Sequence, residues 1–224
     1  MMSLSTLNIS EIFHSIQGEG SFAGWSCTFI RLAGCGHGCI GCDTTYAEHN
    51  GKRLELDEII RQAVRFEAPV LEITGGEPLR QPAVYPLMTK LCDAGERVLL
   101  ETGGFISVEK VDQRIHKIID LKTPSTGVAE QNHPDNIRLA LEADNQHRKH
   151  FEFKIVIASN DDYLWATSLL RKHRLTDSFT VMMGVSFGKL EPAELAGWIL
   201  RDKLPVRFQL QLHKYIWEPS MQGV

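Results

Sequence analysis

Short apolar runs recur along this chain, and segments with the spacing of amphipathic helices lie between them. Runs rich in Val, Ile, Leu and Phe and bounded by turn residues predict strands. After a short extended segment at residues 8–13, such runs cover residues 26–32, 70–74, 97–101, 117–121, 151–158, 179–183 and 207–212. Helices are predicted from the N-cap Asp57 to the segment before Pro69, at residues 81–94, 161–174 and 192–201, and as a short helix between 127 and 149.

This order of strand and helix, with no run of consecutive hairpins, is typical of βα units and a mostly parallel sheet. The chain has 224 residues, fewer than the ~250 usual for a closed eight-fold barrel, and it has fewer clear helices than strands. We therefore expect an α/β fold: an incomplete, partial TIM-like barrel of βα units, organised as a single domain over residues 1–224.

The residues that follow the predicted strands are rich in glycine, cysteine and charge. Loops after the carboxyl ends of parallel strands meet at one rim of such a sheet, where active sites lie. Segments of this kind are residues 34–44, 74–78, 101–104, 120–127 and 212–214. Packing alone does not explain so many unusual strand ends, so we expect one functional site at this rim.

Three cysteines, Cys35, Cys39 and Cys42, lie in one glycine-rich loop with the spacing C-x3-C-x2-C. Thiolates bind soft metals and iron–sulfur clusters, and glycine lets a short loop bring the sulfurs together. Three thiolates around a cluster of four irons leave one iron without a protein ligand and open to a reaction partner. Zinc completed by His37 or Asp43 is an alternative, whereas a disulfide framework is not expected.

Composition and charge narrow the classes of function. Hydrophobic residues make up 43% and charged residues 23% of the chain, which is ordinary for a globular protein with a full core. The formal net charge of −4 argues against a large polyanion-binding surface, so no nucleic-acid partner is expected. Residues 1–8 lack the features of a secretion signal, and no apolar run is long enough to span a bilayer. We therefore expect a cytoplasmic protein without membrane association. The two remaining cysteines, Cys27 and Cys92, lie on a predicted strand and a predicted helix, and we expect both in the core.

The cysteine loop, followed after the next strand by Gly75-Gly76-Glu77-Pro78, resembles the radical S-adenosylmethionine superfamily. The resemblance implies a [4Fe-4S] cluster whose open iron binds the methionine moiety of S-adenosylmethionine. One electron then cleaves the sulfonium and releases a 5′-deoxyadenosyl radical, while the protein supplies positioning. It also implies an external electron donor such as a flavodoxin or a ferredoxin.

Further motifs resemble those of the 7-carboxy-7-deazaguanine synthases within that superfamily. They are residues 15–20 (SIQGEG), Arg31, Cys42-Asp43-Thr44, Thr74 and residues 211–214 (QLHK), and they extend over nearly the whole chain. The implied enzyme is a carbon–nitrogen lyase that converts 6-carboxy-5,6,7,8-tetrahydropterin to 7-carboxy-7-deazaguanine. This reaction is a ring contraction with loss of ammonia on the path to 7-deazapurines such as queuosine. A homodimer is the implied assembly.

Matching positions in that family imply roles for individual residues. The cluster ligands are Cys35, Cys39 and Cys42, and Thr44 would hold Mg²⁺. S-adenosylmethionine would contact Gly41, Cys42, Asp43, Gly76, Glu77, Glu101, Asp120, Leu121 and Lys122. The carboxypterin would contact Ile16, Gln17, Gly18, Glu19, Arg31, Thr74 and His213, and His213 is also the predicted catalytic residue. The residue types agree with these roles: the Arg31 guanidinium matches a carboxylate, the Gln17 amide offers a donor and an acceptor, and the Thr44 hydroxyl is a hard ligand.

The chain departs from the family at two places. Residues 215–224 follow Lys214, whereas some members end near the final histidine and use the terminal carboxylate on the substrate. Residues 123–127 differ from the Ser-Pro-Lys pattern of other members. Two other functions stay open at this point. One is a radical-generating activase that acts on a glycine of a partner protein, and the other is a non-enzymatic iron–sulfur or zinc module.

Overall fold

The computed structural model describes residues 5–224. Residues 1–4, which belong to the predicted domain and to the segment considered as a secretion signal, lie outside the described residues. The strands in this part are β1 (Thr6–Ile16), β2 (Ser26–Leu32), β3 (Lys52–Glu55), β4 (Val70–Gly75), β5 (Val98–Thr102), β6 (His116–Asp120), β7 (Phe151–Ile157), β8 (Thr180–Val185) and β9 (Arg207–Gln209). The α-helices are α1 (Leu56–Val64), α2 (Val84–Asp93), α3 (Asp135–Glu142), α4 (Asn145–Arg148), α5 (Asn160–His173), α6 (Pro192–Asp202) and α7 (His213–Ile216).

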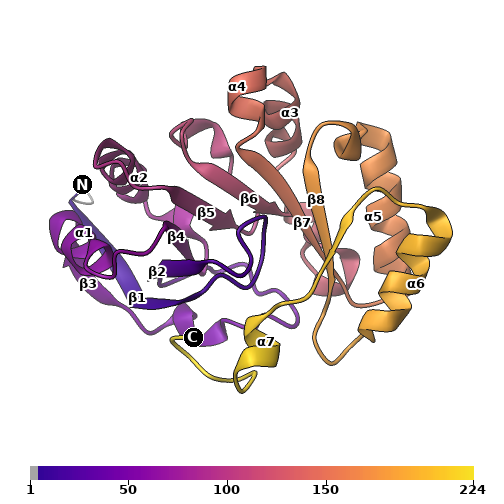
Figure 1. Cartoon of the computed structure of the whole chain (residues 1–224), viewed down its shortest axis with the longest axis horizontal. Helices are drawn as coiled ribbons and strands as arrows, with labels where there is room; N and C mark the ends of the chain where they lie inside the picture. Colours follow the sequence, from indigo (N-terminus) through magenta and orange to yellow (C-terminus); the bar gives the residue numbers. More distant parts are fainter. Residues whose placement is uncertain (1–4) are drawn as a thin grey trace.

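The strands form one sheet in the order β3-β1-β2-β4-β5-β6-β7-β8-β9. From β2 to β9 neighbouring strands are parallel, whereas β1 is antiparallel to both β2 and β3. The sheet curves into an open arc with the larger helices on its outer side, and the C-terminal segment with α7 lies across the open side (Figure 1). The predicted fold, an incomplete α/β barrel with a mostly parallel sheet, is therefore confirmed.

Alternation along the strands separates the hydrophobic core from the concave side of the sheet. On β4, Leu71 and Ile73 belong to the core, whereas Glu72 and Thr74 line the concave side. Successive side chains of a strand point to opposite faces, so a polar residue between two core residues faces the concave side. The same alternation brings to that side Arg31 from β2, Glu101 from β5, Asp120 from β6 and Lys154 from β7.

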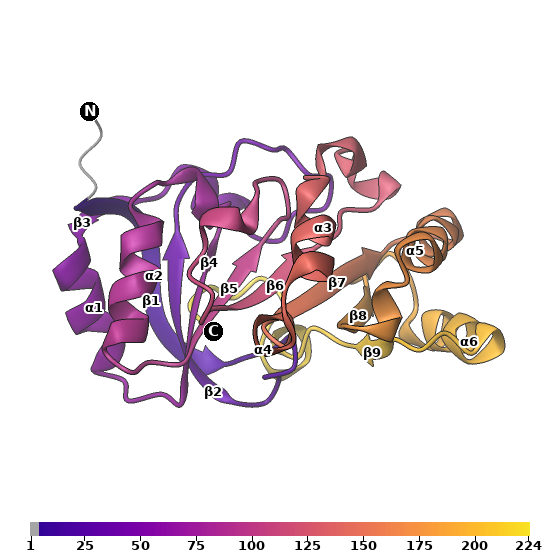
Figure 2. The same cartoon turned by 90° about the horizontal axis from the view of Figure 1, so that it is seen from above.

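Amphipathic helices cover the outer face and complete the core. Ile59 of α1, Leu87 of α2, Tyr163 of α5 and Leu195 of α6 are fully buried in the same cluster as the strand residues. Each such side chain contributes about 1.5–3 kcal/mol by leaving water. Figure 2 shows α1 and α2 near one end of the arc and α5 and α6 near the other. No helix in the described part of the chain is long and apolar enough to cross a membrane.

Three helices begin at other residues than predicted, and the smallest difference is in α5, which begins at Asn160 rather than at 161. α1 begins at Leu56 with Glu55 as its N-cap, so Asp57 lies in the first turn, where its carboxylate pairs with Lys90 at 2.7 Å. α2 begins at Val84 rather than at 81. The reason is the side chain of residue 81, whose amide nitrogen donates to two backbone carbonyl oxygens, each at 3.0 Å, and holds this residue outside the helix.

Strands also differ from the prediction. β9 ends at Gln209 rather than at 212, because the chain leaves the sheet to reach the β1–β2 loop, where the Leu212 N–H donates to the Gly18 carbonyl oxygen at 3.2 Å. β3 was missed, since its sequence KRLE is largely exposed and has no apolar run. Cys27 is fully buried as predicted, whereas Cys92 is only partly buried against the core.

Candidate active site

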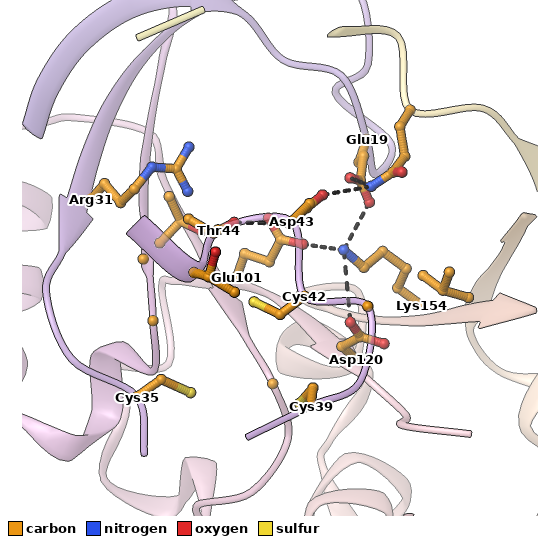
Figure 3. Close-up of a pocket in the computed structure, with 18 of the residues that line it drawn as sticks. Glu19, Arg31, Cys35, Cys39, Cys42, Asp43, Thr44, Glu101, Asp120 and Lys154 are labelled. Carbon is orange, nitrogen blue, oxygen red and sulfur yellow. Dashed lines mark hydrogen bonds and ion pairs between the residues drawn. The ribbon is translucent and has the colours of Figure 1, made fainter. Parts of the chain in front are cut away.

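One pocket of about 1000 Å³ lies on the concave side of the sheet, at the carboxyl ends of the parallel strands. Every predicted strand-end segment contributes to its lining, together with the β1–β2 loop and the last residues of the described chain, including Gly223 and Val224. All of the predicted site residues except Glu77 line this pocket. Figure 3 shows ten labelled side chains of this lining, from the cysteines to Lys154. The predicted strand ends therefore meet at one rim of the sheet, around one pocket.

The cysteine loop follows β2 and is anchored by two side chains from outside it. The Glu48 carboxylate accepts hydrogen bonds from the N–H groups of Cys35 and Gly36, each at 2.9 Å. The Arg80 guanidinium donates to the Cys35 carbonyl oxygen at 2.6 Å. Gly36 has a φ of +74°, and a Cβ there would lie 2.7 Å from Arg80 Nη1. Only glycine therefore permits both the turn and this contact.

The three thiols of this loop face the same pocket and form no disulfide. Figure 3 shows Cys35, Cys39 and Cys42 around a shared space. Burial raises the pKa of the Cys35 thiol and of the Cys39 thiol, so a bound metal is needed to favour their thiolate forms. This donor set fits an iron–sulfur cluster with three protein ligands.

The two side chains considered as a fourth zinc ligand have other partners. His37 Nδ1 lies 2.8 Å from Gln131 Oε1, and its ring stacks on Phe105 with 3.7 Å between the centroids. The Asp43 carboxylate accepts a hydrogen bond from the Thr44 hydroxyl at 2.8 Å. Within residues 5–224, no three His, Cys, Asp or Glu side chains are grouped closely enough to hold one metal ion. The loop therefore suits a polynuclear cluster better than a single zinc ion.

Asp43 connects the cysteine loop to the C-terminal segment. Its carboxylate accepts from Gln211 Nε2 at 3.4 Å and lies 3.6 Å from Lys214 Nζ. Burial raises the pKa of Asp43, but the Thr44 hydroxyl and the Lys214 ammonium outweigh this effect and lower the pKa to about 2. The carboxylate next to Cys42 is therefore ionised at neutral pH.

A lysine that the sequence analysis did not single out lies deep in the pocket. Lys154 is 8% exposed. Its Nζ lies 2.7 Å from Glu19 Oε2 and 3.9 Å from Asp120 Oδ2, and it also pairs with Glu101 (Figure 3). Lys122 pairs with the same Asp120 oxygen at 2.6 Å. Three carboxylates and two ammonium groups thus meet at the ends of β5, β6 and β7.

Arg31 presents its guanidinium to another part of the pocket. Its Nε donates to Glu11 Oε1 at 2.8 Å, and the Tyr46 hydroxyl donates to the same oxygen at 2.7 Å. The guanidinium carbon lies 5.6 Å from the centroid of the Phe13 ring. Among the described residues, neither terminal Nη of Arg31 has a hydrogen-bond partner. The side chain is therefore fixed at one edge while its two terminal nitrogens remain available to a ligand.

Gln17 and Glu72 form a buried polar pair beside Arg31, and both line the pocket. Gln17 Nε2 donates to Glu72 Oε2, and Gln17 Oε1 accepts from the Glu19 N–H at 3.1 Å. Burial and the nearby Glu101 raise the pKa of Glu72 well above its ordinary value. This carboxyl group therefore favours its neutral form, which can donate as well as accept.

His213 lies against the β1–β2 loop at the start of α7. A Cβ on Gly18 would lie 2.7 Å from His213 Nδ1, so glycine is required for this close approach. Burial lowers the pKa of His213. The imidazole is therefore neutral at pH 7 and offers one donor and one acceptor.

Glu77 is the predicted site residue that does not line the pocket. Its carboxylate is fully buried and accepts hydrogen bonds from the Thr102 hydroxyl at 2.8 Å, the Gly103 N–H at 2.9 Å and the Leu79 N–H at 3.1 Å. These bonds join the turn after β4 to the turn after β5. A contact between Glu77 and S-adenosylmethionine stays a prediction. The preceding Gly76 does line the pocket.

Several residues of the site were missed by the sequence analysis. Glu72 is the single charge within a predicted strand, as is Arg31, and this signal could have identified it. Lys154 shares its predicted strand with a second charged residue, Glu152, so the same signal is weaker there. Glu11 and Glu48 act only through contacts with segments distant in the sequence, and no local pattern marks them.

Comparison with known proteins decides the family. A sequence profile of the radical SAM superfamily matches residues 29–198. The 7-carboxy-7-deazaguanine synthase of Chlorobaculum tepidum is 56% identical over 224 residues, which cover 100% of both chains. The chain belongs to the radical SAM superfamily and, within it, to the family of the 7-carboxy-7-deazaguanine synthases. The relative of the same name from Koribacter versatilis is 36% identical over 97% of this chain and 100% of its own.

Solved structures agree on the fold of this radical SAM protein. The crystal structure of QueE from Escherichia coli has a TM-score of 0.69 at 21% identity and covers 92% of this chain and 94% of that chain. Streptococcus suis SuiB has a TM-score of 0.56 at 16% identity and covers 79% of this chain but 46% of its own. Membership in the superfamily implies a [4Fe-4S] cluster and S-adenosylmethionine, which the three-thiol loop fits. The chain belongs to a family of synthases, so neither alternative left open by the sequence, a glycine-radical activase or a non-enzymatic module, is supported.

Proposed function

We propose that this chain converts 6-carboxy-5,6,7,8-tetrahydropterin to 7-carboxy-7-deazaguanine with loss of ammonia, in the biosynthesis of 7-deazapurines such as queuosine. The observation that carries the proposal is the presence in one pocket of three free thiols and an arginine whose terminal nitrogens have no partner among the described residues. The first feature suits a radical-generating cluster, and the second suits a substrate with a carboxylate. The names of the full-length relatives support the same reaction.

The cofactor side of the pocket is built from the cysteine loop and the ends of β4, β5 and β6. Cys35, Cys39 and Cys42 would hold the cluster, which together with S-adenosylmethionine supplies a carbon radical when bound. Gly76 lines the pocket and would contact the cofactor through its backbone, and it packs closely on the cysteine loop, since a Cβ there would lie only 2.4 Å from the Gly34 carbonyl oxygen. Glu101, Asp120 and Lys122 would offer charged partners to the hydroxyl, ammonium and carboxylate groups of S-adenosylmethionine. We assign to the cofactor, in addition, Gly41, Leu121 and the backbone near Glu77.

The substrate side is built from β1, β2 and the C-terminal segment. Arg31 would bind the 6-carboxylate through its two terminal nitrogens. Gln17 and the neutral carboxyl group of Glu72 would meet the pterin edge, where donors and acceptors alternate. Ile16, Gly18, Glu19 and Thr74 complete the substrate contacts. The neutral His213 can donate to the substrate or take up a proton during the rearrangement.

We also propose a Mg²⁺ ion at Thr44. The hydroxyl of Thr44 is a hard ligand, and the ionised Asp43 beside it supplies negative charge. The remaining coordination positions would be filled by substrate oxygen and water, as is usual for this ion.

Two partners complete the proposal. Cleavage of the sulfonium consumes an electron, which a flavodoxin or a ferredoxin would deliver. We also propose a homodimer, which the exposed apolar side chains of Tyr215 and Ile216 on α7 support. We propose one radical SAM domain over residues 1–224, which the single sheet and the large core cluster of the described residues 5–224 support.

Anaerobic reconstitution of the cluster tests the proposed reaction. The reconstituted protein is incubated with dithionite, S-adenosylmethionine, Mg²⁺ and the carboxypterin, and the product is identified by its mass. Formation of 7-carboxy-7-deazaguanine in proportion to enzyme supports the proposal. Cleavage of S-adenosylmethionine with an unchanged carboxypterin would refute it.

A further inference from the structure

Lys154 occupies a position between two groups of ligand-binding residues. On one side its ammonium lies 2.7 Å from Glu19 of the β1–β2 loop, which the family resemblance assigns to the substrate. On the other side it pairs with Glu101 and lies 3.9 Å from Asp120, both assigned to S-adenosylmethionine. Figure 3 shows these contacts converging on the Lys154 ammonium from different segments of the chain.

The sheet register explains why Lys154 reaches both groups. Asp120 and Lys154 are paired residues of the neighbouring strands β6 and β7, so their side chains point to the same concave side. Glu101 reaches the ammonium from β5, beyond β6 in the sheet order. Glu19 comes from a loop, and its second oxygen accepts from Gln211 Nε2 at 2.9 Å. Lys154 thus joins the β1–β2 loop to the ends of β5, β6 and β7.

The charges around Lys154 decide what kind of role it can have. Burial lowers the pKa of Lys154, but the carboxylates of Glu101, Glu19 and Asp120 outweigh burial and hold the pKa well above its ordinary value. Such an ammonium does not release its proton at neutral pH, so it is a poor general acid. Without it, three carboxylates would face one another in a buried pocket with only Lys122 to compensate them.

We propose that Lys154 is a positioning residue that fixes the β1–β2 loop to the ends of β5 and β6, so that the substrate is held next to S-adenosylmethionine. This inference rests on the proposed function and adds a residue to it. The expected consequence concerns coupling. If the loop no longer held the substrate next to S-adenosylmethionine, the cofactor would be cleaved without forming product, so a loosened loop should raise the amount of such uncoupled cleavage.

The test compares Lys154→Met with a matched change in another buried lysine. Lys117 on β6 is 3% exposed, lies outside the pocket lining and donates to the Ile115 carbonyl oxygen at 2.8 Å. Lys117→Met therefore removes a buried ammonium without touching the site. Two quantities are measured on the reconstituted proteins: the Kd of the carboxypterin without reductant, and the ratio of 5′-deoxyadenosine to 7-carboxy-7-deazaguanine during turnover.

In Lys154→Met we expect both the Kd and the product ratio to rise at least about tenfold, because the loop that carries the substrate contacts loses its ion pair with the strand ends. In Lys117→Met both should stay at the wild-type values. Glu19→Gln breaks the same ion pair from the loop side but keeps a polar side chain of the same size toward the substrate, so both quantities should change in the same direction as in Lys154→Met. The double variant Lys154→Met/Glu19→Gln should be no worse than Lys154→Met alone, since the two residues act through one contact.

Glu19→Gln also covers the case in which Lys154→Met does not fold. It leaves Lys154 paired with Glu101 and Asp120, so a normal melting temperature is expected together with the raised product ratio. A wild-type ratio in Glu19→Gln, or additive effects in the double variant, would overturn the inference. A wild-type enzyme that cleaves S-adenosylmethionine but forms no 7-carboxy-7-deazaguanine would instead refute the proposed function.

Discussion

Replacing Arg31 by alanine should weaken binding of the carboxypterin while the protein still folds and still cleaves S-adenosylmethionine. The side chain is 16% exposed, and only its Nε is bound, at 2.8 Å from Glu11 Oε1. The Tyr46 hydroxyl remains 2.7 Å from the same Glu11 oxygen, so the variant leaves that carboxylate with a hydrogen bond. Loss of stability should therefore be small compared with loss of substrate affinity.

The expected magnitude follows from the contact that is lost. Truncation of one partner of a desolvated charge pair costs about 2–5 kcal/mol. The pocket is open to solvent on one side and Arg31 is not fully buried, so the lower part of this range applies, about 2–3 kcal/mol. A tenfold change in Kd corresponds to about 1.4 kcal/mol, so the Kd should rise about 30- to 150-fold. The Kd of Arg31→Lys should lie between those of the wild type and Arg31→Ala, because lysine keeps the charge but lacks the planar guanidinium fork.

Titration of the reconstituted enzyme without reductant measures this effect. The carboxypterin is compared with a tetrahydropterin that lacks the 6-carboxylate. Wild-type protein should prefer the carboxylated ligand, and Arg31→Ala should lose that preference while binding the shorter ligand as wild type does. The double variant Arg31→Ala/Glu11→Gln controls for repulsion between the substrate and the carboxylate left at Glu11.

An unchanged Kd for the carboxypterin would refute the reasoning. So would an equal loss of affinity for both ligands, because Arg31 would then shape the pocket rather than bind the carboxylate.

The remaining predictions concern the cluster, the magnesium ion and a buried lysine. Cys39→Ala should lose the visible absorbance of the cluster and all cleavage of S-adenosylmethionine; retention of cleavage would remove Cys39 from the ligand set. Thr44→Ala should weaken the dependence of turnover on Mg²⁺, and an identical titration curve would assign the ion elsewhere. Burial lowers the pKa of Lys117 from 10.5 to about 8, so the unfolded chain binds more protons between these values and stability should rise with pH across this window. Lys117→Met should remove this rise, on the order of 3 kcal/mol, in urea unfolding; an unchanged slope would show that the ammonium is solvated in the native state.

Much of the fold could be read from local patterns. The apolar runs of β2, β4, β5, β6, β7 and β8 were recognised because each is a short β-branched stretch between turn residues. β3 could not be recognised, since its exposed residues carry no pattern and it pairs with β1 only because the chain returns to that edge. The end of β9 was misplaced because the contact between Leu212 and Gly18 lies between segments distant in the sequence.

Some residues of the candidate site could also be recognised from local sequence, whereas others depend on contacts between distant segments. The spacing of Cys35, Cys39 and Cys42 marks them as metal ligands, and the segment Gly75-Gly76-Glu77-Pro78 after the next strand favours a cluster over zinc. Arg31 is visible as one charge within an apolar strand. The inward turn of Glu77 toward Thr102 could not be predicted, because it depends on how the turns after β4 and β5 meet.

The sequence by itself determined the order of strands and helices, the three-thiol loop and the strand ends that carry polar residues. These features depend on neighbours along the chain, where spacing and side-chain type are sufficient. Only the tertiary structure decided that Lys154 joins Glu19 to Glu101, and that Glu48 anchors the cysteine loop. Such contacts arise from sheet register and loop packing, and they bring together charges whose separation along the sequence gives no sign that they meet.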